Sequence, residues 1–249
     1  MVMKALILQA GYGTRMYPLT EDMPKGLLPV GGKPLMDYLI RKVTAVRNID
    51  KIYVVTNHKF YDAFAGWHGK LSPSSRKKIE LINDGTITNE TRLGSIRDIH
   101  LVITEKNIRD DLMIIGGDNI YDLSFSDFTN AFLKKKKGDV VAVHRVTDPE
   151  RLRRTGVILM DEDSRITLMQ EKPAEPVSEL AVPPLYILRK DTLPLVAEYI
   201  YEGNDTDAPG NLIAWLLERR PVYGYIFKGG CYDVGDIESY EKLKDGLPR

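Results

Sequence analysis

The sequence predicts an α/β fold built around a mostly parallel sheet. Short apolar runs, such as residues 5–8 and 112–115, alternate with longer segments in which apolar residues recur at helical spacing. This alternation is typical of βαβ units, in which a helix connects two parallel strands. The 249 residues, of which 43% are hydrophobic, can bury a sizeable core in one unit. We therefore expect a single domain over residues 1–249.

Each expected element rests on a local pattern. The strands are short runs of aliphatic residues, and the helices place apolar residues on one face, as in Leu93, Ile96, Ile99 and Ile103. The expected strands are residues 5–8, 52–56, 79–82, 112–115, 140–144, 185–188 and 222–227. The expected helices are 59–67, 93–103, 191–202 and 211–219, with others that begin at Pro34 and Ile237.

Two further local features are predicted. The turn-like sequence at 161–164 separates two strand candidates, 156–160 and 166–170, and so predicts a hairpin. The lysines at 134–137 indicate a solvated helix end next to a Gly138 cap.

Charge and cysteine content exclude several classes of function. Lysine plus arginine and aspartate plus glutamate are balanced at 35 each, so the chain has no excess positive charge to bind nucleic acid or an anionic membrane. The single cysteine, Cys231, cannot form an internal disulfide. We see neither a signal peptide nor a long apolar span, and we expect a cytoplasmic protein.

A glycine-rich loop follows the first expected strand. It contains Gly11 and Gly13 and two separated cations, Arg15 and Lys25. Glycines allow backbone N–H groups to approach an anion, and the cations can stabilise charge that develops on a phosphorus. The loop therefore predicts a polyphosphate-binding site.

Two common phosphate loops do not fit this sequence. A Walker loop needs Lys-Ser or Lys-Thr after its last glycine, which is absent here. A dinucleotide-binding loop would have a third glycine where Met16 stands, and Pro18 disfavours a helix that starts directly from the loop.

The longer pattern is Gly-x-Gly-Thr-Arg-x-x-Pro-Leu-Thr followed by Pro-Lys-x-Leu-Leu-Pro. It resembles the signature of the sugar-1-phosphate nucleotidyltransferases, also called nucleotide-sugar pyrophosphorylases. The resemblance covers nearly the whole chain and implies a Rossmann-like three-layer sandwich. No hexapeptide repeats follow residue 240, so we expect a short form without a C-terminal β-helix. Residues from about 1 to 120 would then bind the nucleotide and residues from about 121 to 249 the acceptor.

The resemblance also implies roles for the loop residues. It implies that Arg15 stabilises charge in the transition state and that Lys25 contacts the reacting phosphates. The residues that it places on the nucleotide are Ala10, Gly11, Gly13, Thr14 and Arg15.

A transfer between two anionic substrates needs a divalent cation, and we expect Mg²⁺. Asp118 follows the buried strand 112–115 in a Gly-Gly-Asp-Asn sequence, which by itself is equally typical of a plain turn. The resemblance implies that Asp118 is a catalytic metal ligand. Asp233 matches the aspartate of a Trp-x-Asp-x-Gly element and would be the second ligand. We expect Asp236 to cap the last helix.

The acceptor side shows matches and departures. Glu171-Lys172-Pro173 matches a Glu-Lys-Pro element, which implies that Glu171 binds sugar hydroxyls and Lys172 the sugar's phosphate. Tyr186 matches a Gly-x-Tyr element, although Pro184 replaces its glycine. The Glu-x-Thr-Asp helix of thymidylyltransferases is missing. Asp207 lies in that region, and it either caps the next helix or reaches the acceptor; the sequence leaves both open.

Two residues bear on the base pocket. Gly94 corresponds to the glycine beside the nucleobase, but the same segment also fits a simple cap series in which Asn89 or Thr91 begins the helix. Gln9 stands where relatives have a small residue, and its larger side chain could alter the pocket.

The preferred interpretation is Mg²⁺-dependent nucleotidyl transfer to a hexose 1-phosphate, with glucose 1-phosphate and dTTP or UTP as the first candidates. One alternative is a cytidylyltransferase that acts on phosphocholine or another non-sugar phosphate. Another is a regulatory subunit that binds nucleotide without catalysis. The histidines are scattered, and we propose no covalent intermediate. Relatives are often dimers or tetramers, so a homo-oligomer is compatible with the resemblance.

Overall fold

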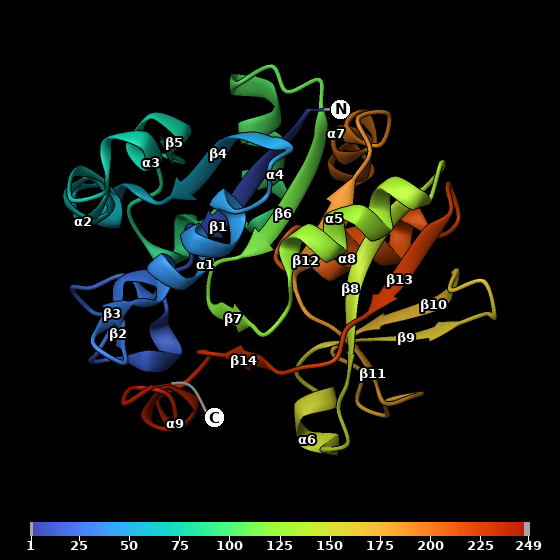
Figure 1. The fold of residues 1–249 in the computed structure, drawn as a ribbon. Helices are drawn as coiled ribbons and strands as arrows, with labels where there is room; N and C mark the ends of the chain where they lie inside the picture. The colour runs from blue at the N-terminus through green and yellow to red at the C-terminus, as the bar shows by residue number, and fades with distance from the viewer. Residues whose placement is uncertain (1, 247–249) are drawn as a thin grey trace.

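In the computed structural model, which describes residues 2–246, a large twisted sheet runs through the centre of the molecule and helices cover both faces (Figure 1). Its strands are β1 (Met3–Gln9), β4 (Ile49–Thr56), β5 (Ile79–Asn83), β6 (Asp111–Gly116), β8 (Asp139–Arg145), β9 (Gly156–Met160), β10 (Ile166–Glu171), β11 (Leu180–Val182), β12 (Leu185–Leu188) and β13 (Val222–Ile226). Two small sheets lie beside it, and they pair β2 (Pro29–Val30) with β3 (Lys33–Pro34) and β7 (Asn119–Tyr121) with β14 (Cys231–Asp233).

The strand order is β10-β9-β11-β8-β12-β6-β1-β4-β5, with β13 paired with β8. β1 is parallel to both β4 and β6, β5 is parallel to β4, and β13 is parallel to β8. β12 lies antiparallel between β6 and β8, so β6 and β8 point the same way. Only β10, β11 and β12 run against the common direction. The mostly parallel sheet expected from the sequence is confirmed.

The helices form the two outer layers. They are α1 (Leu35–Thr44), α2 (His58–Gly69), α3 (Pro73–Lys78), α4 (Ser95–Glu105), α5 (Phe125–Lys134), α6 (Pro149–Leu152), α7 (Leu193–Tyr201), α8 (Pro209–Leu216) and α9 (Ile237–Glu241). Successive residues of β1 face opposite layers: Ala5 and Ile7 pack in the core covered by α1, α2 and α5, and Leu6 in the core covered by α4, α7 and α8. The strands are therefore apolar on both faces, which explains their continuous apolar runs.

The expected hairpin is confirmed, because β9 and β10 pair antiparallel. Several short elements were not foreseen. β7, β11 and β14 have three residues each, which is too short for alternation to show. α3 buries no residue and so carries no apolar periodicity. Within residues 2–246, no helix combines the length and apolar character needed to cross a bilayer.

The end of α5 differs from the sequence prediction. The helix ends at Lys134 with Lys135 as its C-cap, so Gly138 is not the cap. Gly138 instead turns the chain into β8 with φ +88°, and its backbone lies directly against the carbonyl of Pro221. A left-handed conformation next to a close backbone contact is a position that only glycine occupies without strain.

We predict that Gly138→Ala lowers the free energy of unfolding by about 1–3 kcal/mol, because a Cβ would overlap the Pro221 carbonyl and strain the backbone. Chemical denaturation measures the effect. The matched control is Gly66→Ala in α2, where nothing lies within 4 Å of the added Cβ, and where alanine should be neutral or slightly stabilising. Equal stability of the two variants would contradict the prediction.

Candidate active site

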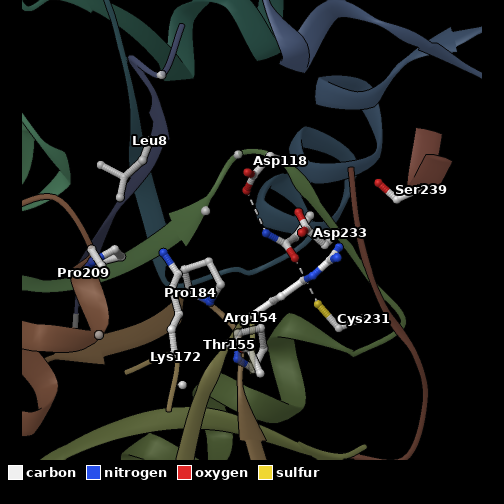
Figure 2. Close-up of a pocket in the computed structure, with 18 of the residues that line it drawn as sticks. Leu8, Asp118, Arg154, Thr155, Lys172, Pro184, Pro209, Cys231, Asp233 and Ser239 are labelled. Carbon is white, nitrogen blue, oxygen red and sulfur yellow. Dashed lines mark hydrogen bonds between the residues drawn. The ribbon is translucent and has the colours of Figure 1, made fainter. Parts of the chain in front are cut away.

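A cleft of about 770 Å³ opens at the carboxyl ends of β1 and β6 (Figure 2). Ligands of parallel α/β sheets bind at this edge, because the loops that leave neighbouring strands converge there. The cleft is lined by the loop after β1, the loop after β6, the first turns of α4 and α8, the segment around α6, and β14.

Most of the residues singled out from the sequence line this one cleft. They are Ala10, Gly11, Gly13, Arg15, Lys25, Asp118, Glu171, Lys172, Tyr186 and Asp233. Two others, Thr14 and Gly94, are not part of its lining, although their neighbours Gly13, Arg15 and Ser95 are. Residues that are more than 200 positions apart in the sequence, such as Arg15 and Asp233, are thus brought to the same cavity.

The glycine-rich loop is held in a defined shape. Gly13 has φ +65°, and the Thr20 hydroxyl donates a hydrogen bond to the Gly13 carbonyl at 2.8 Å. A Cβ at position 13 would lie 3.1 Å from that hydroxyl oxygen, so both the conformation and the space favour glycine. The hydrogen bond from Thr20 to Gly13 thus closes the loop, and Gly11 and Gly13 both line the cleft.

Gln9 connects this loop to the loop after β6. Its side chain is buried and donates from Nε2 to the Gly117 carbonyl at 2.6 Å. A Cβ at Gly26 or at Gly117 would overlap the Gln9 amide, so both glycines make room for it. The large side chain therefore packs between the two loops, where it supports Lys25 on one side and Asp118 on the other.

Asp118 and Lys25 are in direct contact. Lys25 Nζ lies 3.1 Å from Asp118 Oδ2, and Asn119 Nδ2 donates to Asp118 Oδ1 at 2.8 Å. Burial by itself would raise the pKa of Asp118, but the charge and hydrogen bond of Lys25 outweigh it and the pKa is lowered. Asp118 is therefore an ionised carboxylate at neutral pH.

Asp233 lies beside Asp118, because β14 pairs with β7 and places Asp233 opposite Asn119. Burial and the negative charge of Asp118 raise the pKa of Asp233 to about 7, while Lys25 and Arg15 act in the opposite direction. Two neighbouring carboxylates that repel each other at the lining of a cleft fit a site for a divalent cation. Residues 2–246 hold no group of three or more acidic, histidine or cysteine ligands, so phosphate oxygens and water would complete the coordination.

Glu171 and Lys172 form the other end of the cleft. Gly156 and Gly210 leave the space in which the Glu171 carboxylate sits, since a Cβ at Gly210 would overlap it. Burial raises the pKa of Glu171, and Lys172, with Nζ 4.0 Å from Glu171 Oε1, lowers it in part. Lys172 has φ +48°, an uncommon conformation for a non-glycine residue that is often found at functional sites.

Tyr186 and Pro184 form the wall between these two ends. Tyr186 is almost fully buried in β12, and its ring lines the cleft. The Pro184 carbonyl accepts hydrogen bonds from the Gly116 N–H at 2.6 Å and the Tyr121 hydroxyl at 3.1 Å. The ring of Pro184 packs against Gly116, where a Cβ would overlap it. The proline that replaces the expected glycine is thus fixed at the end of β6.

Gly94 is the N-cap of α4, so the prediction that Asn89 or Thr91 caps this helix is wrong. Those residues belong to a separate 3₁₀ turn, η3 (Asn89–Thr91), which Thr88 caps. Gly94 has φ +87°, and a Cβ there would lie 2.7 Å from the Thr206 carbonyl oxygen. The backbone requires glycine at this position whether or not a nucleobase lies beside it.

The sequence suggests Asp236 and Asp207 as helix N-caps, and the structure shows which of them caps a helix. Asp236 caps α9 as expected, accepting from the Ser239 N–H at 2.9 Å. Asp207 does not cap α8, whose N-cap is Ala208. It pairs with Arg92 at 3.0 Å and lines the cleft, so contact with an acceptor is the alternative that remains for it.

The cleft contains residues that the sequence analysis did not identify. Asp98 lies one turn after Ser95 on α4, and both side chains line the cleft. Asp98 is 5% exposed, and its Oδ1 is buried without a hydrogen-bond partner. Burial, together with the negative charge of Asp84, raises the pKa of Asp98 to about 8. In the sequence, the one feature that could have indicated that Asp98 lines the cleft is its position beside the apolar face of α4.

Comparison with known proteins assigns the chain to a class. Residues 4–248 match the family model described as nucleotidyl transferase, and the chain belongs to this family. The structure of a UDP-glucose pyrophosphorylase complexed with UDP-glucose superposes with a TM-score of 0.81 at 24% identity, covering 98% of both chains. A putative glucose-1-phosphate thymidylyltransferase from Bacillus anthracis gives 0.79 at 24% identity, over 98% of this chain and 94% of that one. The three-layer fold is confirmed.

Two curated proteins are similar to the chain in sequence. The chain is 31% identical to the bifunctional protein GlmU of Methanocaldococcus jannaschii, over 94% of this chain and 51% of that protein. It is 30% identical to a putative mannose-1-phosphate guanyltransferase of Sulfolobus acidocaldarius, over 97% and 62%. The chain therefore spans about half to two thirds of the length of these relatives. The resemblance to sugar-1-phosphate nucleotidyltransferases drawn from the sequence motifs is confirmed.

We predict that Asp98→Asn stabilises the protein more strongly as the pH rises. The folded wild type retains a proton on Asp98 that the unfolded chain releases, so wild-type stability decreases between about pH 4 and the raised pKa of about 8. Asparagine does not titrate. The difference in unfolding free energy should grow by at most about 1.4 kcal/mol per pH unit in this window. Denaturation from pH 5 to pH 8 measures it, and parallel pH profiles would show that Asp98 is ionised in the folded protein.

Proposed function

We propose that the chain catalyses Mg²⁺-dependent nucleotidyl transfer from a nucleoside triphosphate to a hexose 1-phosphate, giving a nucleotide sugar and pyrophosphate. Glucose 1-phosphate with dTTP or UTP is the first combination to test. The observation that carries the proposal is the single cleft that has Lys25, Asp118 and Asp233 at one end and Glu171 and Lys172 at the other. A cytoplasmic location, where both substrates are found, is part of the proposal.

In this reaction an oxygen of the acceptor's phosphate attacks the α-phosphorus of the nucleotide, and pyrophosphate leaves from the opposite side. The backbone around Gly11 and Gly13 would bind the triphosphate, and Arg15 and Lys25 would offset the charge on the phosphoryl oxygens. Glu171 would accept hydrogen bonds from sugar hydroxyls, while Lys172 binds the acceptor's phosphate. Correct positioning of the two substrates and charge stabilisation supply the rate.

Asp118 and Asp233 would hold the magnesium. When bound, the ion would neutralise and polarise the oxygens of the α-phosphate. Lys25 has a second task, since its contact with Asp118 keeps this carboxylate ionised. The nucleotide-binding part, residues from about 1 to 120, would thus provide one ligand near its end. The acceptor-binding part, from about 121 to 249, would provide the other.

The alternative acceptor, phosphocholine or another non-sugar phosphate with a cytidylyl donor, is favoured by one observation. The cleft wall near the Glu171 carboxylate is apolar and is formed by Val182, Pro183, Pro184 and Pro209. An acidic group beside apolar surface also suits a methylated ammonium group. A regulatory subunit without catalysis ranks last, because Arg15, Lys25, Asp118 and Asp233 are all present and line the cleft.

The deciding experiment is pyrophosphate release with Mg²⁺ across a grid of nucleotides and acceptors. The nucleotides are dTTP, UTP, CTP, GTP and ATP; the acceptors are glucose, mannose, galactose and N-acetylglucosamine 1-phosphates and phosphocholine. Release confined to a few sugar combinations supports the proposal and names donor and acceptor together. Release with phosphocholine alone supports the alternative. Nucleotide binding without release under any condition would favour the regulatory interpretation.

We predict that Asp118→Asn and Lys25→Ala each lower kcat at least about 100-fold, as expected for the loss of a group that binds the metal or offsets charge at the reacting phosphates. The unfolding midpoints should remain close to that of the wild type. The matched control is Lys33→Ala, at an exposed position outside the cleft lining, which should leave kcat unchanged. Near-normal turnover in Asp118→Asn or Lys25→Ala would remove that residue from the mechanism.

A further inference from the structure

Arg154 joins the two sides of the cleft. It follows α6 on the acceptor side and donates from its guanidinium to Asp236 Oδ2 at 3.0 Å. Asp236 is the N-cap of α9, three residues after Asp233. Both partners line the cleft, and in Figure 2 the side chain of Arg154 extends toward Asp233, with Lys172 farther along the cavity. Arg154 thus extends from the acceptor side of the cleft toward the proposed metal ligands.

The Arg154–Asp236 ion pair is easy to break. The side chains are 68% and 34% exposed, and ion pairs that water reaches in this way contribute little to stability. Asp236 does not need Arg154 for its capping role, because a different oxygen, Oδ1, accepts the Ser239 N–H at 2.9 Å. An incoming anion can therefore take the place of Asp236 at little cost.

The other cleft cations are paired within the fold or lie on the nucleotide side, and Lys242 pairs with Glu238 one turn before it. Lys25 contacts Asp118, and Arg151 donates from Nη2 to the Cys231 carbonyl at 3.1 Å. Arg15 belongs to the glycine-rich loop. Arg154 is the arginine on the acceptor side whose partner is an exposed carboxylate. A guanidinium can bind two oxygens of a phosphate monoester at once, which Lys172 cannot do.

We propose that Arg154 is an acceptor-binding residue that exchanges Asp236 for the phosphate monoester of the acceptor and, together with Lys172, holds that phosphate for attack. The proposal rests on the proposed function. It gives a role to a residue outside the motifs of the sequence analysis. It also accounts for a cation that lines the cleft and is held only by a weak, partly exposed ion pair.

The neighbouring residue provides a matched control. Arg153 has the same charge and lies in the same segment, but it bonds to Glu150 and to the Ala174 carbonyl. It is not part of the cleft lining among residues 2–246. Replacing either arginine changes the net charge equally, so a difference between the two variants reports position in the cleft rather than charge.

The test compares steady-state kinetics of Arg154→Ala, Arg154→Lys, Arg153→Ala and Asp236→Asn with the wild type, using the donor and acceptor that the grid identifies. We expect Arg154→Ala to raise the KM for the acceptor at least 10-fold and to change the KM for the nucleotide less than threefold. Arg154→Lys should recover the acceptor KM only in part. Arg153→Ala should match the wild type. Asp236→Asn retains a good capping residue and should leave the acceptor KM equal or lower.

Three outcomes would overturn the proposal: an unchanged acceptor KM in Arg154→Ala, equal effects in Arg153→Ala and Arg154→Ala, or a rise confined to the nucleotide KM. Equal unfolding midpoints exclude misfolding as the cause. If the wild type releases no pyrophosphate, the proposed function fails, and calorimetric titration with glucose 1-phosphate tests Arg154 independently. Binding at least 10-fold weaker in Arg154→Ala than in Arg153→Ala would support it, and equal binding would overturn it.

Discussion

The buried amide of Gln9 holds together the two loops on which the proposed chemistry depends. It bonds to the Gly117 carbonyl, and it packs against Gly26 in the loop that carries Lys25. Because Gln9 ends the central strand β1, the position of the Lys25–Asp118 contact is set by the core of the sheet. A flexible glycine-rich segment thereby acquires a fixed reference point, which is the condition for stabilising charge without reorganisation.

Electrostatic balance is the second constraint. Asp118 and Asp233 repel each other, and the cleft offsets this with Lys25 and Arg15, so one carboxylate is held ionised while the pKa of the other is raised to about 7. On α4, Asp98 has no neighbouring cation of this kind among residues 2–246, and its pKa is raised further, to about 8. The site can thus bind a cation at Asp118 and Asp233, and the protonated carboxyl group of Asp98 can donate a hydrogen bond.

Much of this could be predicted from the sequence, for definable reasons. Strands buried on both faces give continuous apolar runs, and a loop motif that extends over nearly twenty residues is specific, so the sheet and the family were predicted correctly. Gly94 and Asp207 were harder to interpret, because their partners, Thr206 and Arg92, lie far away in the sequence. Asp98 and Arg154 were missed, because only the folded chain shows that they face the cleft.

The pairing of β7 with β14 also has a consequence for biosynthesis. Asp118 and the glycine-rich loop lie in the first half of this sequence, whereas Asp233 follows more than 100 residues later and is brought to Asp118 by the pairing of β14 with β7. A ribosome that synthesises from the N-terminus therefore makes the two sides of the cleft at different times. Chains that end before β14 carry the glycine-rich loop and Asp118 without Asp233.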